Sequence, residues 1–149
     1  MIEPLTYEDV AEDYPKVFQA GRPRCGVGVG AGWTKLLREL LQGIEDLLPA
    51  EHDFSVQQIK EKFGGIRVYT FSPKLPEETR RRIDKLISLA ESRSFGACEQ
   101  CGEPGRPDSG DSRYGWIKTL CKEHQAERSR GYGLDNVRRP VPTEDIELK

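Results

Sequence analysis

Two pairs of cysteine and histidine residues constrain the fold of this chain more than any other feature. Cys98 and Cys101 are separated by two residues, and Cys121 and His124 repeat that spacing after an interval of nineteen residues. Two ligands at this spacing can reach one ion from a tight turn, and a second such pair completes the tetrahedral set that structural zinc prefers. The sequence therefore predicts one structural Zn²⁺ ion per chain, bound by three thiolates and one imidazole.

Two other interpretations compete with zinc, namely a disulfide with two bystander residues and reduced thiols packed in a core. Both leave the repeated two-residue spacing unexplained. A catalytic zinc ion needs a position open to water, whereas four local ligands fill the shell, so the pattern favours a structural ion. The fourth cysteine, Cys25, lies more than seventy residues upstream and is predicted to be a partly buried free thiol.

The residues around the ligands predict a small finger. Gly102 follows the second cysteine, where the backbone has to turn sharply. Residues 116–120 have the composition of a short strand, and those from Lys122 onward have that of a helix. The last two ligands would then lie at a strand end and in a first helical turn. This order resembles a treble-clef zinc finger, and it also resembles a zinc ribbon.

The residues before the finger predict an α+β body. A short helix is expected from Thr6, followed by a glycine-rich loop over residues 20–32. A longer helix should run from Trp33 to Leu48, because apolar residues recur there at helical spacing.

A hairpin and a further helix complete the predicted body. Two strands within residues 53–71 should pair, because Gly64 and Gly65 supply the positive φ that a tight turn needs. The next helix is expected from Pro76 and leads into the finger without a linker. We therefore expect an α+β fold in which a small antiparallel sheet packs with two or three helices and an integrated zinc finger. The predicted divisions are a body over residues 1–95, a finger over 96–130 packed on it, and an extended tail over 131–149.

Charge is distributed unevenly along the chain. The net charge of −2 excludes a uniformly basic protein that coats nucleic acid. Residues 1–54 hold five basic and ten acidic side chains, whereas residues 55–95 hold nine basic and five acidic. Any nucleic-acid contact is therefore expected to use the basic face of residues 55–95.

Basic and aromatic residues alternate around the hairpin, a pattern typical of proteins that contact phosphates and stack bases. The same pattern also fits a solvated strand face with Phe63 and Tyr69 in the core. Arginines of the following helix can equally pair with acidic neighbours on that helix. The candidate contacts to a protein or nucleic-acid partner are Lys60, Lys62, Arg67, Tyr69 and Arg81.

Catalytic signatures are weak. Four alternate glycines between residues 26 and 32 precede a helix, but they match no nucleotide-binding motif. Of the two histidines, His124 belongs to the metal set and His52 lies in an acidic loop, so a nucleophile lacks an evident base. The helix after Cys121 carries no further His or Asn of the kind that a treble-clef nuclease needs. We expect no catalytic residues, no cofactor besides zinc and no small-molecule substrate.

The sequence also bears on location. No apolar run is long enough to cross a bilayer, and residues 1–14 lack the basic start and apolar stretch of a secretory signal. Cysteines in a reducing compartment are more often metal ligands than disulfides. We therefore expect a cytoplasmic protein without membrane contact.

Four stretches of the sequence resemble a group of small proteins found in bacteria and in phage genomes. They are CGVGVGAGW, QIKEKFGGIRVYT, AESRSFGACEQCG and GWIKTLCKEH, and the likeness covers roughly residues 25–125. The resemblance implies a bacterial or phage origin and a zinc site at Cys98, Cys101, Cys121 and His124, and it supplies no mechanism.

Together these observations predict a non-enzymatic, zinc-stabilised accessory protein that acts in the host cytoplasm by contact with a host or phage protein. A nucleic-acid-binding protein that uses the basic face of residues 55–95 is the alternative. A metal-dependent nuclease is the third class.

Overall fold

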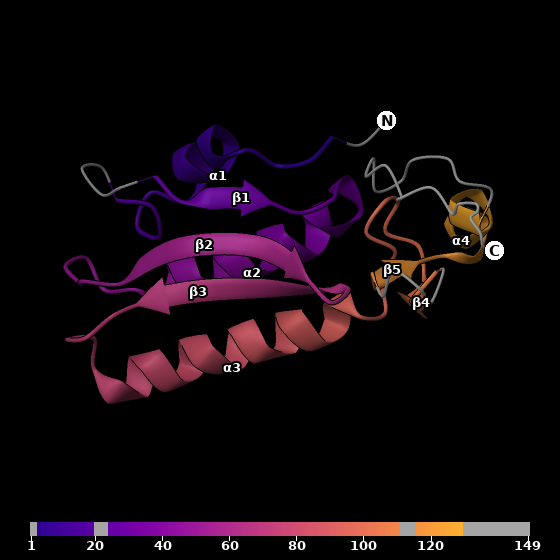
Figure 1. Ribbon diagram of the computed structural model, residues 1–149. Coiled ribbons are helices and arrows are strands. Elements are labelled where there is room, and N and C mark those ends of the chain that lie inside the picture. Colours follow the sequence, from indigo (N-terminus) through magenta and orange to yellow (C-terminus); the bar gives the residue numbers. More distant parts are fainter. Residues whose placement is uncertain (1–2, 20–23, 111–115, 130–149) are drawn as a thin grey trace.

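The computed structural model describes residues 3–19, 24–110 and 116–129, which form the predicted α+β fold (Figure 1). Helices α1, α2 and α3 and a three-stranded sheet make up the larger part, and a two-stranded sheet with α4 follows at one end. The elements are α1 (Tyr7–Asp13), β1 (Gly26–Gly28), the 3-10 helix η1 (Ala31–Trp33), α2 (Thr34–Leu47), β2 (Ser55–Lys62), β3 (Gly65–Phe71), α3 (Glu77–Ser94), β4 (Arg106–Asp108), β5 (Lys118–Leu120) and α4 (Lys122–Ser129).

The longest apolar stripe of the sequence becomes the buried face of α2. The leucine and isoleucine side chains between positions 36 and 44 expose at most 8% of their surface, and Trp33, just before α2, is fully buried. The helix ends at Leu47, because Leu48 adopts an extended backbone immediately before Pro49. This stripe forms the centre of the core, as its periodicity predicts.

The predicted hairpin is present, with β2 and β3 paired antiparallel. Phe63 and Gly64 form the two-residue turn, with φ angles of 56° and 89°, whereas Gly65 is the first residue of β3, which corrects the prediction that Gly65 supplies a positive φ. Two successive residues in the left-handed region make a type I′ turn, whose twist matches that of the flanking strands.

The glycine-rich segment is not a loop throughout, which corrects the prediction for residues 26–28. Gly26–Gly28 forms β1, and β1 pairs in parallel with β2 so that Val27 lies opposite Ile59. The sheet therefore has the order β1-β2-β3 and is mixed, with the hairpin as its antiparallel part. Glycine has little intrinsic strand preference, so contact with β2 determines this strand.

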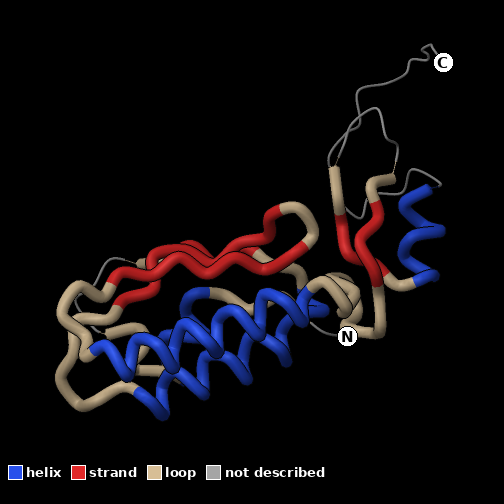
Figure 2. Tube along the Cα trace, turned by 90° about the horizontal axis from the view of Figure 1, so that it is seen from below, coloured by secondary structure: helices blue, strands red, loops and turns tan. Residues whose placement is uncertain are grey.

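The helices lie on one face of the three-stranded sheet, and in the described part of the chain no helix covers the other face (Figure 2). Ile59, Ile66 and Val68 belong to the buried core beneath the sheet. Beside α2, the hydroxyl of Tyr14 donates to the Arg38 carbonyl at 3.4 Å and so attaches the end of α1. The described helices therefore pack on one sheet face and leave the other uncovered.

The second sheet, β4-β5, and α4 lie beyond the hairpin turn at one end of the molecule (Figure 1). No helix of the described residues is both long enough and apolar enough to cross a membrane. The extended tail predicted over residues 131–149 lies outside the described residues.

Candidate metal centre

The four predicted ligands come together at one point. Their three Sγ atoms and one imidazole nitrogen all lie within 4.8 Å of one another. The Sγ atoms of Cys101 and Cys121 are 3.8 Å apart, and Nδ1 of His124 lies 3.4 Å from Sγ of Cys98 and 3.2 Å from Sγ of Cys121. A tetrahedral zinc ion with bonds of about 2.3 Å to sulfur and about 2.0 Å to nitrogen places its ligand atoms about 3.5–3.8 Å apart. The cluster is compatible with one such ion, and its cysteines form no disulfide.

Cys98 and Cys101 lie on a tight turn after α3. The N–H of Gly102 donates to the Cys98 carbonyl at 2.8 Å, and the N–H of Cys98 donates to the Glu103 carbonyl at 2.8 Å. Gly102 has a φ of 85°, so the turn uses the left-handed conformation expected of this glycine. These two backbone bonds define the knuckle, residues 98–103, which carries the first ligand pair.

Cys121 and His124 lie where β5 ends and α4 begins. β5 pairs antiparallel with β4, and the N–H of Gln125 donates to the Cys121 carbonyl at 2.9 Å at the start of α4. His124 is therefore in the first helical turn, as predicted. Unpaired N–H groups at a helix start favour a thiolate there.

The pKa values of two of the cysteine thiols in the cluster are shifted from the ordinary value of a cysteine. Burial opposes ionisation of Cys121, but hydrogen bonds from the backbone and side chain of His124 outweigh it and lower the pKa of this thiol to about 7. Burial raises the pKa of the Cys101 thiol to about 11. Burial therefore opposes ionisation of the Cys101 thiol, and a bound dication would favour its thiolate form.

Glu99, between the two knuckle cysteines, is a site residue that sequence reasoning missed. Only 4% of its surface is exposed, and its N–H donates to the Thr119 carbonyl at 3.0 Å. Burial raises the pKa of its carboxyl group to about 7, and its Oε2 atom lies 4.0 Å from Nζ of Lys118. An acidic residue beside two cysteines gives no sequence signal of burial, because β5 buries it only in the folded chain.

The knuckle is bonded to the start of α2. The N–H of Gly32 donates to the Glu99 carbonyl at 2.8 Å, and Nε1–H of the buried Trp33 donates to the Ala97 carbonyl at 2.8 Å. Both donors come from the end of the glycine-rich segment. The metal-binding residues are therefore held against the larger part of the fold by direct hydrogen bonds.

Close backbone packing explains the glycine at position 32. A Cβ atom there would clash with the carbonyl oxygen of Cys98 and lie 2.6 Å from the backbone nitrogen of Gly102 and 2.7 Å from that of Cys101. All three atoms belong to the knuckle backbone and cannot move aside as a flexible side chain would. Gly32 is therefore explained by the close approach of the knuckle backbone, without a bound phosphate or other anion.

The hairpin turn contacts the same end of the molecule. The hydroxyl of the fully buried Thr119 donates to the Gly64 carbonyl at 2.5 Å. A Cβ atom at Gly64 would lie 3.0 Å from Cγ2 of Ile117. β5 is therefore packed on the turn between β2 and β3, while the knuckle is packed on the start of α2.

Arg128 joins α4 to the second sheet. Its guanidinium group donates to the Asp108 carbonyl at 2.7 Å and to the Trp116 carbonyl at 2.5 Å, and it forms an ion pair of 3.3 Å with the Asp108 carboxylate. Only 3% of the arginine is exposed. The helix that carries His124 is thereby fixed to β4 and to the residues before β5.

The candidate contact residues divide between two places. Lys60 and Arg67 lie directly opposite one another on β2 and β3, and Lys62 lies at the turn with Nζ 5.7 Å from the ring centroid of Phe63. Phe63 and Tyr69 expose 63% and 40% of their surface. The alternative that places these two rings in the core is therefore wrong.

Arg81 does not join that group. It lies on α3 and forms an ion pair of 2.9 Å with Glu78, which also pairs with Arg82 at 3.1 Å. These are the local pairs of i,i+3 and i,i+4 spacing that the alternative interpretation allows. Arg81 belongs to α3, and the helices lie on the side of the sheet opposite to its uncovered face (Figure 2).

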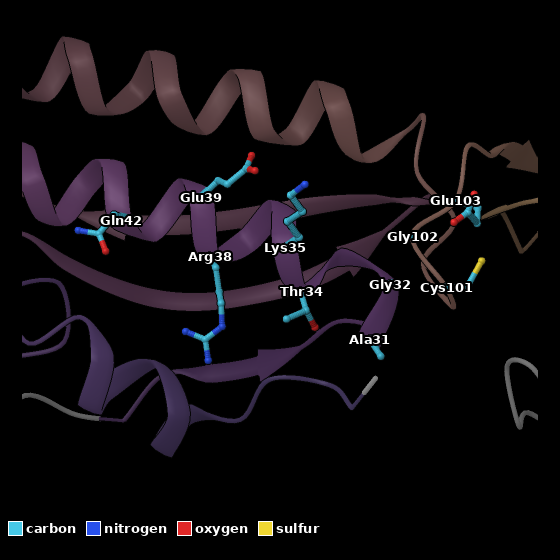
Figure 3. A pocket seen from close by; sticks show the side chains of 10 residues that line it. All are labelled: Ala31, Gly32, Thr34, Lys35, Arg38, Glu39, Gln42, Cys101, Gly102 and Glu103. Carbon is cyan, nitrogen blue, oxygen red and sulfur yellow. The ribbon is translucent and has the colours of Figure 1, made fainter. Parts of the chain in front are cut away.

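A cleft of about 680 Å³ separates the first turns of α2 from the knuckle (Figure 3). Two of the charged side chains that line it are paired, Arg38 with Asp13 at 2.8 Å and Glu39 with Arg93 at 3.2 Å. Charges of both signs line the cleft, and these two already have partners outside it, so the cleft indicates no particular ligand.

Comparison with protein-family models, with curated proteins and with solved structures gives no match for the chain. Within the described residues, the four ligands are the one group of three or more cysteine, histidine and acidic side chains close enough to share an ion. The fold and this cluster are therefore the features of the molecule that bear on its function.

Proposed function

We propose that this chain is a zinc-stabilised binding protein without catalytic activity, which acts by contact with a macromolecular partner. The observation that carries the proposal is the complete ligand set, because Cys98, Cys101, Cys121 and His124 supply all four ligands of a tetrahedral ion. Sulfur-rich tetrahedral sites select zinc among the common divalent metals. A shell filled by protein leaves no position for a substrate or an activated water, so the ion is structural.

The order of the elements supports a treble-clef finger. A knuckle carries the first ligand pair, the β4-β5 hairpin follows, and α4 begins at the second pair. A helix that supplies a ligand from its first turn favours the treble clef over a zinc ribbon, in which both ligand pairs lie on turns.

Zinc has a clear physical task in this arrangement. Among the described residues from 96 to 110 and from 116 to 129, the buried apolar side chains are few, namely those of Cys98 and Leu120. So small a core does not order a segment of this length, and metal binding then contributes folding energy directly, on the order of 10 kcal/mol in small zinc domains. The ordered knuckle in turn packs on Gly32 and Trp33.

We propose a host or phage protein as a partner, met in the cytoplasm of a bacterial host. Two exposed aromatic side chains support this, Phe63 with 63% and Trp116 with 46% of their surface exposed. Phe63 is next to Gly64 in the chain, and Trp116 is next to Ile117. Gly64 and Ile117 lie close together, because a Cβ atom at Gly64 would lie 3.0 Å from Ile117. Exposed aromatic rings on a rigid surface are the side chains that dominate protein interfaces.

Metal content and thermal unfolding test the zinc role. We expect one zinc ion per chain by elemental analysis, and a lower melting temperature after chelation. Cys101→Ser should lose zinc and melt lower, whereas Cys25→Ser, a matched change outside the cluster, should keep the metal. A metal-free protein that melts at the wild-type temperature would contradict the proposal, and so would cleavage of nucleic acid that requires added Mg²⁺ or Mn²⁺.

A further inference from the structure

The uncovered face of the three-stranded sheet carries an ordered set of basic and aromatic side chains. Arg67, Tyr69 and Phe71 alternate along β3, and Lys60 of β2 lies directly opposite Arg67. Tyr69 exposes 40% and Phe71 exposes 56% of its surface. We call these four residues the open sheet face, because the helices pack on the other side of the sheet (Figure 2).

Among the described residues, no acidic side chain pairs with the charges of the open sheet face. Lys60 and Arg67 are like charges at directly opposed positions, an arrangement that destabilises a sheet. Neither forms an ion pair with an acidic side chain of the described residues. Nε of Arg67 is buried without a hydrogen-bond acceptor. An anion placed between the two side chains would relieve the repulsion between their charges.

β1 extends this surface without adding side chains to it. Gly26 lies opposite Gln58, and Gly28 lies opposite Lys60. A Cβ atom at Gly28 would meet nothing within 4 Å, so the space above this strand is open. A flat strip of backbone beside the basic pair lets an extended polymer lie close to the sheet.

We propose that the open sheet face binds single-stranded nucleic acid, with Tyr69 and Phe71 stacking on unpaired bases and Lys60 and Arg67 contacting phosphates. The inference rests on the proposed function and names a partner class for this one face. Stacking requires bases that are free of a duplex, and aromatic rings beside cations are the platform on which single strands bind. A protein partner fits less well, because lysine and unpaired charge are depleted in the cores of protein interfaces.

Fluorescence anisotropy with the zinc-loaded full chain tests the proposal. The probes are fluorescein-labelled oligo(dT) and oligo(U) of about twelve nucleotides, each compared with a duplex of equal length at about 50 mM salt. We expect the single strands to bind more tightly than the duplexes. The arm that binds better assigns DNA or RNA, because the 2′-hydroxyl distinguishes the two at equal charge.

Substitutions on the face separate stacking from charge. Tyr69→Ala and Phe71→Ala should each weaken binding by about 5- to 100-fold. Lys60→Ala and Arg67→Ala should each reduce the slope of log affinity against log salt by about 0.7. Zinc content and melting temperature are measured for every variant, so that a loss of binding is separated from a loss of fold.

Two matched controls lie in the helical layer. Leu89 on α3 exposes 54% of its surface, close to the value for Phe71. Arg81 on α3 is an exposed cation that is already paired with Glu78. Leu89→Ala and Arg81→Ala should leave oligonucleotide affinity within about twofold of wild type, because surface changes outside a contact have small effects.

Several outcomes would overturn the proposal. The first is that folded, zinc-loaded protein binds no oligonucleotide at low salt. The second is that the duplex binds more tightly than the single strand. The third is that Tyr69→Ala and Phe71→Ala both keep the wild-type affinity. A protein partner that is lost with Tyr69→Ala, without any oligonucleotide binding, would assign the face to protein and also overturn it. None of these results removes the zinc-stabilised binding protein, which fails instead if the wild-type chain holds no zinc or melts identically without it.

Discussion

Replacing Gly32 by alanine should weaken attachment of the metal knuckle without touching a ligand. The added Cβ atom would clash with the Cys98 carbonyl oxygen and approach the backbone nitrogens of Cys101 and Gly102 to 2.7 Å and 2.6 Å. The knuckle has to move away, and the 2.8 Å hydrogen bond from the Gly32 N–H to the Glu99 carbonyl is then lost or lengthened. Overpacking costs about 1–3 kcal/mol and a lost hydrogen bond about 1 kcal/mol, so we expect destabilisation of about 2–4 kcal/mol.

Urea unfolding of the zinc-loaded protein, followed by circular dichroism, measures this loss. With a slope of about 2 kcal/mol per M, the midpoint should fall by about 1–2 M. Gly28→Ala is the control, because a Cβ atom at that position would meet nothing within 4 Å. It should unfold at the wild-type midpoint or slightly above it. Equal midpoints for the two variants would refute the claim that Gly32 is required for knuckle packing.

Three further predictions concern residues outside the ligand set. Arg128→Ala leaves two carbonyls and a carboxylate without their buried donor. It should therefore destabilise the protein by about 2–4 kcal/mol in the same urea assay. An unchanged urea midpoint would contradict the hydrogen bonds described for α4. Thr6→Ala removes the hydroxyl of a capping box whose partner is Asp9, and it should cost about 1 kcal/mol by thermal unfolding. Burial raises the pKa of the Cys25 thiol to about 11, so iodoacetamide should label Cys25 slowly at pH 8, faster as the pH rises towards 11 and fastest in urea. Mass spectrometry of the labelled peptides checks this, and rapid labelling of the native protein would be inconsistent with a buried thiol.

Elements with strong local signals could be predicted from the sequence. The apolar stripe after Trp33 repeats at helical spacing over several turns and becomes the buried face of α2. The hairpin follows from the glycines at its turn, although the second positive φ falls on Phe63 and not, as predicted, on Gly65. The ligand cluster follows from the donor chemistry and spacing of the two pairs. In each case a short sequence pattern carries the signal, even where, as in the ligand cluster, two such patterns have to meet in the fold.

Features that depend on distant contacts could not be predicted. β1 consists of two glycines and a valine, and it is a strand because β2, some thirty residues later, pairs with it. Burial of Glu99 requires Thr119 of β5, and the close approach at Gly32 requires the knuckle. Sequence periodicity carries no information on which distant backbone approaches a given residue, so these contacts emerge only from the folded chain.

The glycine-rich segment connects the three-stranded sheet with the knuckle. Gly26 and Gly28 lie at the edge of the sheet beside the basic pair, while Gly32, a few residues on, is bonded to the metal knuckle. A knuckle that detaches after loss of metal therefore frees the chain immediately after β1, and the edge of the open sheet face loses part of its support. The side chains that carry the face belong to β2 and β3, which pair with each other independently of β1. Metal loss is therefore expected to weaken oligonucleotide binding less than substitution of Tyr69 does. If zinc contacted the oligonucleotide directly, metal loss would weaken binding at least as much as that substitution.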